Sequence, residues 1–307
     1  MNDLRYAVRQ LLKSPGFTVV AVLTLALGIG VNTAMFSGLH SLLMPELPYP
    51  ESERLIRIFR TSPYSQRWPH SPAAFLDLRE QRDVFSHLAA TTSRRVNLSE
   101  PGEPPERLRA ERATADFLPM LGLAPQLGRG FRPDEDQPGR DQVAILSHAF
   151  WVRRFNADPA VLGRVLRLDG EPVTVIGVLP PEFADRQTWG RADVLRPMAF
   201  SSAERENRGN NYLDVFARLQ PGVTDVQATA AVTTMLARAR ADGSDASEDT
   251  GYRVVPLARS RMDPRGQLML WMILGLAGFV LLIACANLAN LQFARTAYRS
   301  RELAIRC

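Results

Sequence analysis

Residues Leu268 to Cys307 read LMLWMILGLAGFVLLIACANLANLQFARTAYRSRELAIRC, and the organisation of the whole chain follows from them. No charged residue occurs from Leu268 to Ala286, and about nineteen residues at 1.5 Å each nearly cross a hydrocarbon core of roughly 30 Å. A transmembrane helix is therefore predicted over residues 267–294. Asn287 and Asn290 follow three residues apart among alanines, which is typical of a face that packs against another helix in lipid.

The segment that follows this helix, residues 295–307, is basic, and Glu302 is its single acid. Its positive residues are Arg295, Arg299, Arg301 and Arg306. Because Lys and Arg are enriched in cytoplasmic loops, this end of the chain is predicted to lie in the cytosol.

The run LLIACANLANLQFARTAYRSRELAIR resembles the membrane segment of FtsX-like permeases of the MacB type, which are ABC transporter subunits. The resemblance implies that a short helix touching an ATPase follows, and then further membrane helices. The chain ends inside this motif, so it is expected to be the first half of a permease module, truncated after the second membrane helix. The basic segment would then be the cytosolic start of the FtsX-like coupling region.

The N-terminus predicts a short amphipathic helix and a first membrane span. Residues 1–16 place Arg5, Arg9 and Lys13 along one side of a helix, which suits the inner membrane surface better than the charged part of a signal peptide. Residues 17–43 are uncharged and longer than the apolar part of a cleaved signal, so they are predicted to be transmembrane helix 1. Small side chains recur there every four residues, which predicts close packing with another helix. These residues are Ala26, Gly30, Ala34 and Gly38.

The net charge of +5 comes from the two ends of the chain, which carry +2 over residues 1–16 and +3 over residues 295–307. The region between them is neutral, so the composition favours two cytosolic edges and not a nucleic-acid partner. The two cysteines, Cys285 and Cys307, lie outside the central region, which therefore needs a core without disulfides.

Residues 44–266 are predicted to form a mixed α+β domain outside the cytosol. A strand near Leu55–Phe59 with a helix from Pro72 to about Gln81, and a strand–helix–strand unit over residues 212–257, suggest two β-α-β units that bracket an insertion. The insertion is expected to contain a strand at 143–146, a helix capped by Ser147, and a hairpin over residues 165–178.

Three further motifs, LGRGFRPDED, WVRRFNADPAVLGRVLRLDGEPVTVIGVLPPEF and LQPGVT, resemble the MacB-type periplasmic core domain, especially that of large duplicated permeases. The resemblance covers essentially the whole chain. It implies a porter-like subdomain made of the β-α-β units and an inserted second subdomain.

The sequence lacks the common enzyme and cofactor-binding motifs. Lys13 is the only lysine and follows Leu12, so no P-loop is possible, and no His-Glu-x-x-His or Gly-x-Ser-x-Gly motif occurs. The four histidines are expected to be surface or packing residues. The acids at 134–141 have Pro138 and Ile145 where a calcium loop needs ligands, so a solvated acidic loop is expected. The chain is predicted to bind no cofactor or metal, with ATP and Mg²⁺ held by a partner ATPase.

Two functions remain. The first is a permease subunit of a MacB/FtsX-type ABC transporter, multi-pass in the inner membrane, with both termini cytosolic and its central domain periplasmic. It would contact an ATPase, membrane lipid and a second permease copy, and would transmit ATP-driven motion for export or release of a substrate. The second is a membrane-anchored sensor or regulatory scaffold with a periplasmic ligand-binding domain. In the first function the basic tail is a lever as well as an orientation signal; otherwise its arginines only pair with lipid phosphates.

Overall fold

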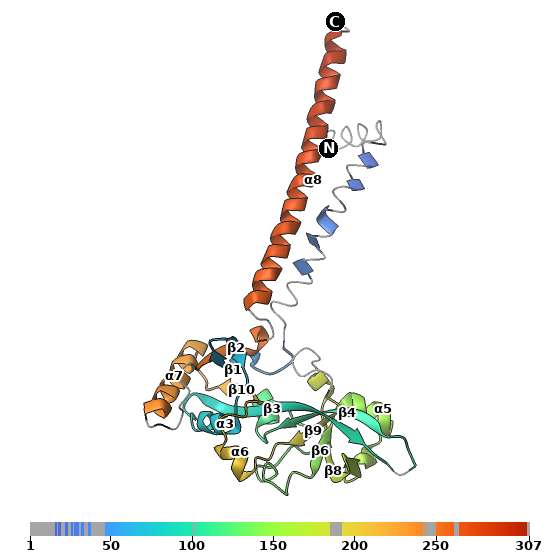
Figure 1. Ribbon diagram of the computed structural model, residues 1–307. Coiled ribbons are helices and arrows are strands. Elements are labelled where there is room, and N and C mark those ends of the chain that lie inside the picture. The colour runs from blue at the N-terminus through green and yellow to red at the C-terminus, as the bar shows by residue number, and fades with distance from the viewer. Residues whose placement is uncertain are drawn as a thin grey trace. The chain divides into compact units, whose positions relative to one another are not determined.

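The computed structural model describes residues 47–100, 102–184, 192–241, 243, 250–260 and 264–305, with single positions between 16 and 37; in the last helix only part of the side chains is described. The chain forms two compact units (Figure 1). One consists of residues 1–45 and 262–307, and the other of residues 46–261. The second unit, called the domain below, coincides closely with the region 44–266.

The domain is built on one mixed sheet. Its strands are β1 (Leu55–Ser62), β2 (Ser65–Trp68), β3 (Phe85–Leu98), β4 (Glu106–Ala113), β5 (Leu127–Gly128), β6 (Val143–Leu146), β7 (Val165–Leu168), β8 (Glu171–Val178), β9 (Val194–Pro197), β10 (Asp214–Leu219) and β11 (Gly251–Pro256). Its α-helices are α3 (Pro72–Arg79), α4 (Phe117–Leu121), α5 (His148–Phe155), α6 (Ser202–Glu206) and α7 (Asp225–Ala241). Short 3-10 turns lie at Ser52–Arg54, Pro159–Val161, Pro181–Ala184 and Leu257–Arg259.

The strand order β11-β1-β10-β3 at one end of the sheet consists of two interlocked β-α-β units. β1 and β3 both run antiparallel to β10 and are joined by α3, while β10 and β11 both run antiparallel to β1 and are joined by α7. Each parallel pair is therefore separated by a strand of the other unit, which is the ferredoxin-like arrangement. The predicted unit over residues 212–257 is confirmed, as are the strand and the helix predicted for the first unit, whose returning strand β3 is not among the predicted strands. Together the two units are called the ferredoxin-like half.

The other half consists of the inserted residues 99–213, with the strand order β4-β9-β6-β8-β5 and β7 paired to β8. The predicted hairpin β7–β8 is confirmed. Asp169 and Gly170 have φ of 50° and 87°, and two positive φ values are what a two-residue type I′ turn requires.

β3 joins the two halves. Up to Thr91 it pairs with β10, and from Thr91 to Leu98 it pairs with β4, so that it runs through both halves (Figure 1). Neither β3 nor β4 is predicted by the sequence pattern, because FSHLAATTSRRVNL and ERLRAERA place polar residues at positions that the sheet buries. Glu111 in β4, for example, is only 6% exposed.

Side-chain caps start the helices where the sequence predicts them. Ser71 accepts a hydrogen bond from Ala74 N at 3.3 Å, and Ser147 accepts one from Phe150 N at 3.2 Å. Thr224 and Gln227 form the reciprocal bonds of a capping box before α7. These boundaries depend on residues three apart, so a single sequence is sufficient to locate them.

Both faces of the sheet are covered. Helices α3 and α7 pack on one face of the ferredoxin-like half through Phe75, Leu78, Val232 and Leu236, and α4 covers the opposite face through Phe117 and Leu121. A third cluster fills the inserted half around Phe150 of α5.

The loop LGRGFRPDED is held by two close contacts. A β-carbon on Gly128, whose φ is +78°, would stand 2.2 Å from Ile176 O. Only glycine therefore fits at this position, where β5 pairs with β8. The solvated acidic loop expected here is wrong in part. Glu135 is buried and accepts hydrogen bonds from both Arg129 Nη atoms, at 2.9 and 2.6 Å, and from Arg132 N at 2.8 Å. A bidentate arginine and a backbone donor replace water around this carboxylate.

In the other unit, α8 runs from Pro264 to Ile305 without interruption, over 42 residues. Leu268–Asn287 is long and apolar enough to cross a membrane, and it is the one such helix among the described residues. Most of the first predicted span, residues 17–43, lies outside the described residues.

Candidate functional site: a cleft between α3, β3 and α4

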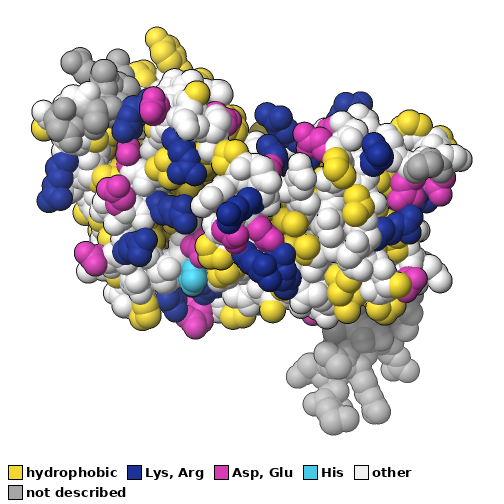
Figure 2. Space-filling model, turned by 90° about the horizontal axis from the view of Figure 1, so that it is seen from below, with side chains coloured by type: hydrophobic (Ala, Val, Ile, Leu, Met, Phe, Trp, Pro, Cys, Tyr) yellow, Lys and Arg dark blue, Asp and Glu magenta, His cyan; other side chains and the backbone are white. Residues whose placement is uncertain are grey.

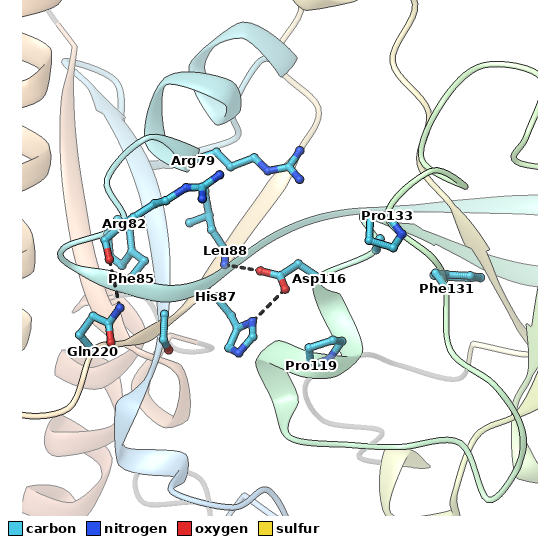
Figure 3. Close-up of a pocket in the computed structure, with 12 residues that line it drawn as sticks. Arg79, Arg82, Phe85, His87, Leu88, Asp116, Pro119, Phe131, Pro133 and Gln220 are labelled. Atoms are coloured by element: carbon cyan, nitrogen blue, oxygen red, sulfur yellow. Dashed lines mark hydrogen bonds and ion pairs between the residues drawn. The ribbon is translucent and has the colours of Figure 1, made fainter.

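An open cleft with a volume of about 420 Å³ lies where α3, the start of β3 and the start of α4 come together (Figure 3). It contains groups from both halves of the domain. Its lining residues are Arg79, Arg82, Phe85, Ser86, His87, Leu88, Ala115, Asp116, Pro119, Phe131, Pro133 and Gln220.

The central polar contact of the cleft joins His87 of β3 to Asp116, the residue before α4. His87 Nδ1 lies 2.8 Å from Asp116 Oδ1, and Leu88 N donates to Asp116 Oδ2 at 2.9 Å (Figure 3). Because a carboxylate can only accept, His87 Nδ1 carries the proton in this bond, and Nε2 is the ring nitrogen left to meet a ligand. Both oxygens of Asp116 are occupied, so this acid ties α4 to β3.

A bulge positions His87. The pairing of β10 with β3 shifts between Arg218, which faces His87, and Leu219, which faces Phe85, so Ser86 is the extra residue. Ser86 Oγ lies 3.2 Å from Arg218 O and 3.4 Å from Leu219 O. The hydroxyl is directed to backbone carbonyls, and no bond to His87 is present among the described contacts, so these residues are not arranged as a Ser-His-Asp triad.

Two arginines form the basic rim of the cleft. Arg79 ends α3 and Arg82 follows it; both side chains are exposed, and Figure 3 shows their guanidinium groups on the same side of the cleft. Neither guanidinium has a hydrogen bond or ion pair within the described part of the chain. Gln220 holds this turn in place by donating to Arg82 O at 3.1 Å.

The remaining walls are apolar. Phe85 is buried beneath the cleft, while Phe131 and Pro133 come from the loop after β5 and Pro119 from α4. Aromatic and proline side chains beside a few polar groups are typical of small-molecule sites.

A second polar cluster lies on the sheet between the two halves. Glu111 of β4 is buried beside Thr91 and Ser93, with which it is hydrogen-bonded, and burial raises the pKa of Glu111 to about 7. Asp214 adds to this rise and is itself paired with Arg57. The carboxyl of Glu111 therefore changes charge near neutral pH inside the sheet.

The described histidines fall into different environments. His70 is fully buried, with Nε2 2.8 Å from Ile58 O and its ring stacked on Tyr252, and burial lowers the pKa of His70 to about 3. This confirms a packing role for His70. His148 stacks edge-on against Trp151. His87 is expected from the sequence to be a surface or packing residue, but it lines the cleft. The bond that marks it as a site residue is to Asp116, 29 residues away, so the sequence pattern does not reveal it.

The predicted packing residues of the first helix are only partly described. Ala26 and Gly30 are exposed, and a β-carbon on Gly30 would meet nothing within 4 Å. Ala34 and Gly38 lie outside the described residues. Asn287 and Asn290 are on α8 and exposed. Their packing against another helix in lipid stays a prediction.

The predicted coupling residues lie at the end of α8. The helical backbone includes the positions of Arg295, Arg299, Arg301 and Glu302, as expected for a helix that continues past Phe293. Arg306 lies outside the described residues.

Charge on the surface of the domain is mixed. Figure 2 shows acidic and basic side chains interleaved on one face, with both signs gathered near its middle. Among the described residues, no group of three or more His, Cys, Asp or Glu side chains is placed to hold a metal ion.

Comparison with known proteins identifies the family. Residues 18–235 match the model of the MacB-like periplasmic core domain. The chain therefore belongs to the MacB-like periplasmic core domain family. The MacB-type resemblance of the sequence motifs is confirmed by this match. No curated protein matches the chain at a significant level.

One solved structure shares the fold of the domain, and two others match with lower scores. A domain of a protein assigned as a permease, from Porphyromonas gingivalis, matches with a TM-score of 0.55 at 20% identity, over 72% of this chain and 99% of that chain. The periplasmic region of MacB from Actinobacillus actinomycetemcomitans gives a TM-score of 0.49 at 15% identity, over 67% and 90% of the two chains. The extracellular domain of the noncanonic ABC-type transporter YknZ from Gram-positive bacteria gives 0.46 at 16% identity, over 66% and 99%.

Proposed function

We propose that this chain belongs to a permease subunit of a MacB/FtsX-type ABC transporter. In this proposal, closure of a partner ATPase moves the membrane helices, and the motion reaches the domain and expels or releases a substrate. Membership of the MacB-like family supports the class of protein.

The observation that carries the proposal is the length of α8. Its 42 residues span about 63 Å at 1.5 Å per residue, which exceeds the roughly 40–45 Å of a bilayer with its headgroups. A single continuous helix can therefore extend from the domain side through the membrane and beyond it. Such a helix transmits displacement or rotation without a flexible joint.

ATP and Mg²⁺ are assigned to the partner ATPase and not to this chain. A P-loop needs a Gly-Lys-Ser or Gly-Lys-Thr sequence to hold the β- and γ-phosphates, and Lys13 is the only lysine. The other proposed partners are membrane lipid and a second permease copy, for which the exposed Ala26 and Gly30 would provide a contact face.

The proposed location is the inner membrane, with both termini in the cytosol and the domain outside it. In a background without Cys285 and Cys307, a cysteine at exposed Thr233 should react with a membrane-impermeant thiol reagent on cells with an opened outer membrane. A cysteine at Asn2 should stay unlabelled until the inner membrane is lysed. The reverse pattern would overturn the topology.

The lever itself can be tested with two insertions after Phe293 in the complete permease with its ATPase. Four alanines and four glycines add the same number of residues, but glycine is about 1 kcal/mol per residue less favourable in a helix. The alanine insertion should keep an ATP-dependent change in distance between spin labels at Thr233→Cys and at the equivalent position of the second permease copy. The glycine insertion should lose it while ATP hydrolysis continues, whereas equal behaviour of the two variants would contradict the lever.

The alternative is a membrane-anchored sensor or regulatory scaffold, because a helix, an external domain and a second helix are also the layout of sensors. In a sensor the spin-label distance responds to an external ligand without ATP. That response would favour the sensor over the permease.

A further inference from the structure

We propose that the cleft between α3, β3 and α4 is a binding site for a small molecule that carries a carboxylate next to an aromatic ring. The carboxylate would lie at Arg79 and Arg82, and the ring would lie against Phe131 and the neighbouring prolines. The inference concerns binding by the domain and does not depend on the proposed transport.

The charge of the cleft favours an anion. The lining residues that carry full charge are Arg79, Arg82 and Asp116. Asp116 keeps its negative charge, but its two oxygens already accept from His87 Nδ1 and Leu88 N, and it stands against two arginines. The two arginines therefore leave a positive excess at the rim, and a guanidinium binds a carboxylate through two parallel hydrogen bonds.

One neighbouring acid could compete with a ligand for Arg79. Asp136 lies close enough for Arg79 and Arg205 to lower its pKa, although burial has the larger effect and raises that pKa. No hydrogen bond joins Asp136 to Arg79 among the described contacts. The positive charge of Arg79 is also stabilised by its place in the last turn of α3, where it complements the helix dipole. Asp136 and the dipole of α3 both act on Arg79, so the donors of Arg82 stay available to a ligand.

His87 adds direction to the site. Since Asp116 fixes the ring through Nδ1, Nε2 is held in one orientation at the cleft. It can bond a polar atom of the ligand between the basic rim and the apolar wall.

The apolar wall and the volume of the cleft determine the aromatic part and the size of the ligand. Phe131, Pro119 and Pro133 offer flat surfaces on which an aromatic ring can stack. About 420 Å³ lies in the roughly 300–1,000 Å³ range of small-molecule sites, so a one- or two-ring carboxylate fits in size.

The test compares 1-naphthylacetate with 1-naphthylacetamide, which keeps the ring and removes the charge. Equilibrium dialysis is carried out with the full chain in nanodiscs of zwitterionic lipid, with empty nanodiscs subtracted. We expect saturable binding of naphthylacetate at least about tenfold tighter than that of the amide, which is the effect of roughly 1.4 kcal/mol.

Variants of the lining residues test whether the probes bind in the cleft. Arg79→Gln with Arg82→Gln should abolish the preference for the acid, and Phe131→Ala should weaken both probes. The control Arg107→Gln with Arg109→Gln removes the same charge from exposed positions of β4 that do not line the cleft, and should bind as the wild type does. Equal binding of acid and amide, an unchanged preference in the cleft variant, or no saturable binding of either probe would overturn the proposal. Because no ATPase is present, none of these outcomes bears on transport.

Discussion

Gly28 of the first helix lies directly against Leu281 of α8: a β-carbon on Gly28 would stand 3.1 Å from Leu281 Cδ1. Between Leu270 and Leu281, the described α8 residues that are buried or half-buried follow one side of the helix at steps of three and four, namely Leu270, Ile273, Leu274, Ala277, Gly278 and Leu281. Ala26 and Gly30 are each two residues from Gly28, about 200° around a helix, so they point away from this contact. Ala26 and Gly30, the two described residues of the small-residue stripe, therefore do not make this contact.

This contact predicts a difference between two glycines. Gly28→Leu should separate the helices and cost about 1–3 kcal/mol, because the added side chain meets Leu281. Gly30→Leu removes the same kind of residue where an added β-carbon meets nothing within 4 Å, and should not lower stability. Thermal unfolding of the full chain in detergent measures both. Equal losses in the two variants would contradict the contact.

The two bonds of Asp116 predict a stability effect. Asp116→Asn keeps one accepting oxygen but turns an NH₂ group toward either Leu88 N–H or His87 Nδ1–H. We expect a loss of about 1–3 kcal/mol in urea unfolding. Asp83→Asn is the control, because this exposed acid has no partner in the described part of the chain. A midpoint unchanged in Asp116→Asn would show that the bonds do not stabilise the domain.

Glu111 should make the domain less stable as pH rises. Its folded-state pKa is about 7, above the unfolded value of 4.5, so the folded state holds the proton more tightly. The resulting stability is fully present below pH 4.5 and is lost as pH rises through 7, by up to about 3 kcal/mol. Glu111→Gln should lack this dependence and exceed the wild type in stability at pH 8. Parallel stability curves for the two proteins would rule out a protonated Glu111.

His70 should act in the opposite direction. Its folded-state pKa is about 3, below the unfolded value of 6.5, so stability is present above pH 6.5 and is lost as pH falls toward 3. The slope from this residue is at most about 1.4 kcal/mol per pH unit. The difference between wild type and His70→Gln, measured by urea unfolding from pH 7 to 4, isolates this contribution. A flat difference would mean that His70 takes up a proton as readily in the fold as in the unfolded chain, so that burial does not lower its pKa.

Glu302 is predicted to matter for coupling. On a helix it lies three residues from Arg299 and four from Arg306, at spacings where opposite charges pair. In the complete permease, Glu302→Lys should keep membrane insertion, because it strengthens the inside bias, but should uncouple ATP hydrolysis from transport or release. Ala304→Lys adds a positive charge without removing the acid and should stay coupled. If both variants are coupled, the tail is an orientation signal only.

The sequence alone determined the features that depend on neighbouring residues, namely helix starts, a hairpin turn and an apolar helix. Ser71, Ser147 and the capping box at Thr224 start helices through bonds to residues three positions away, and the turn at Asp169 and Gly170 closes a hairpin within two residues. The apolar segment of α8 is likewise set by composition over one helix length. Each of these signals is complete within about twenty residues, so a single chain displays it.

Contacts between distant segments are what only the tertiary structure decided. β3 and β4 are strands because neighbours on both sides supply their hydrogen bonds, although their side chains are largely polar. Glu111 becomes a buried carboxyl, and His87 meets Asp116, for the same reason. The free energy of these groups depends on burial and on partners that the folded sheet brings together, and neither is contained in the spacing of residues along the chain.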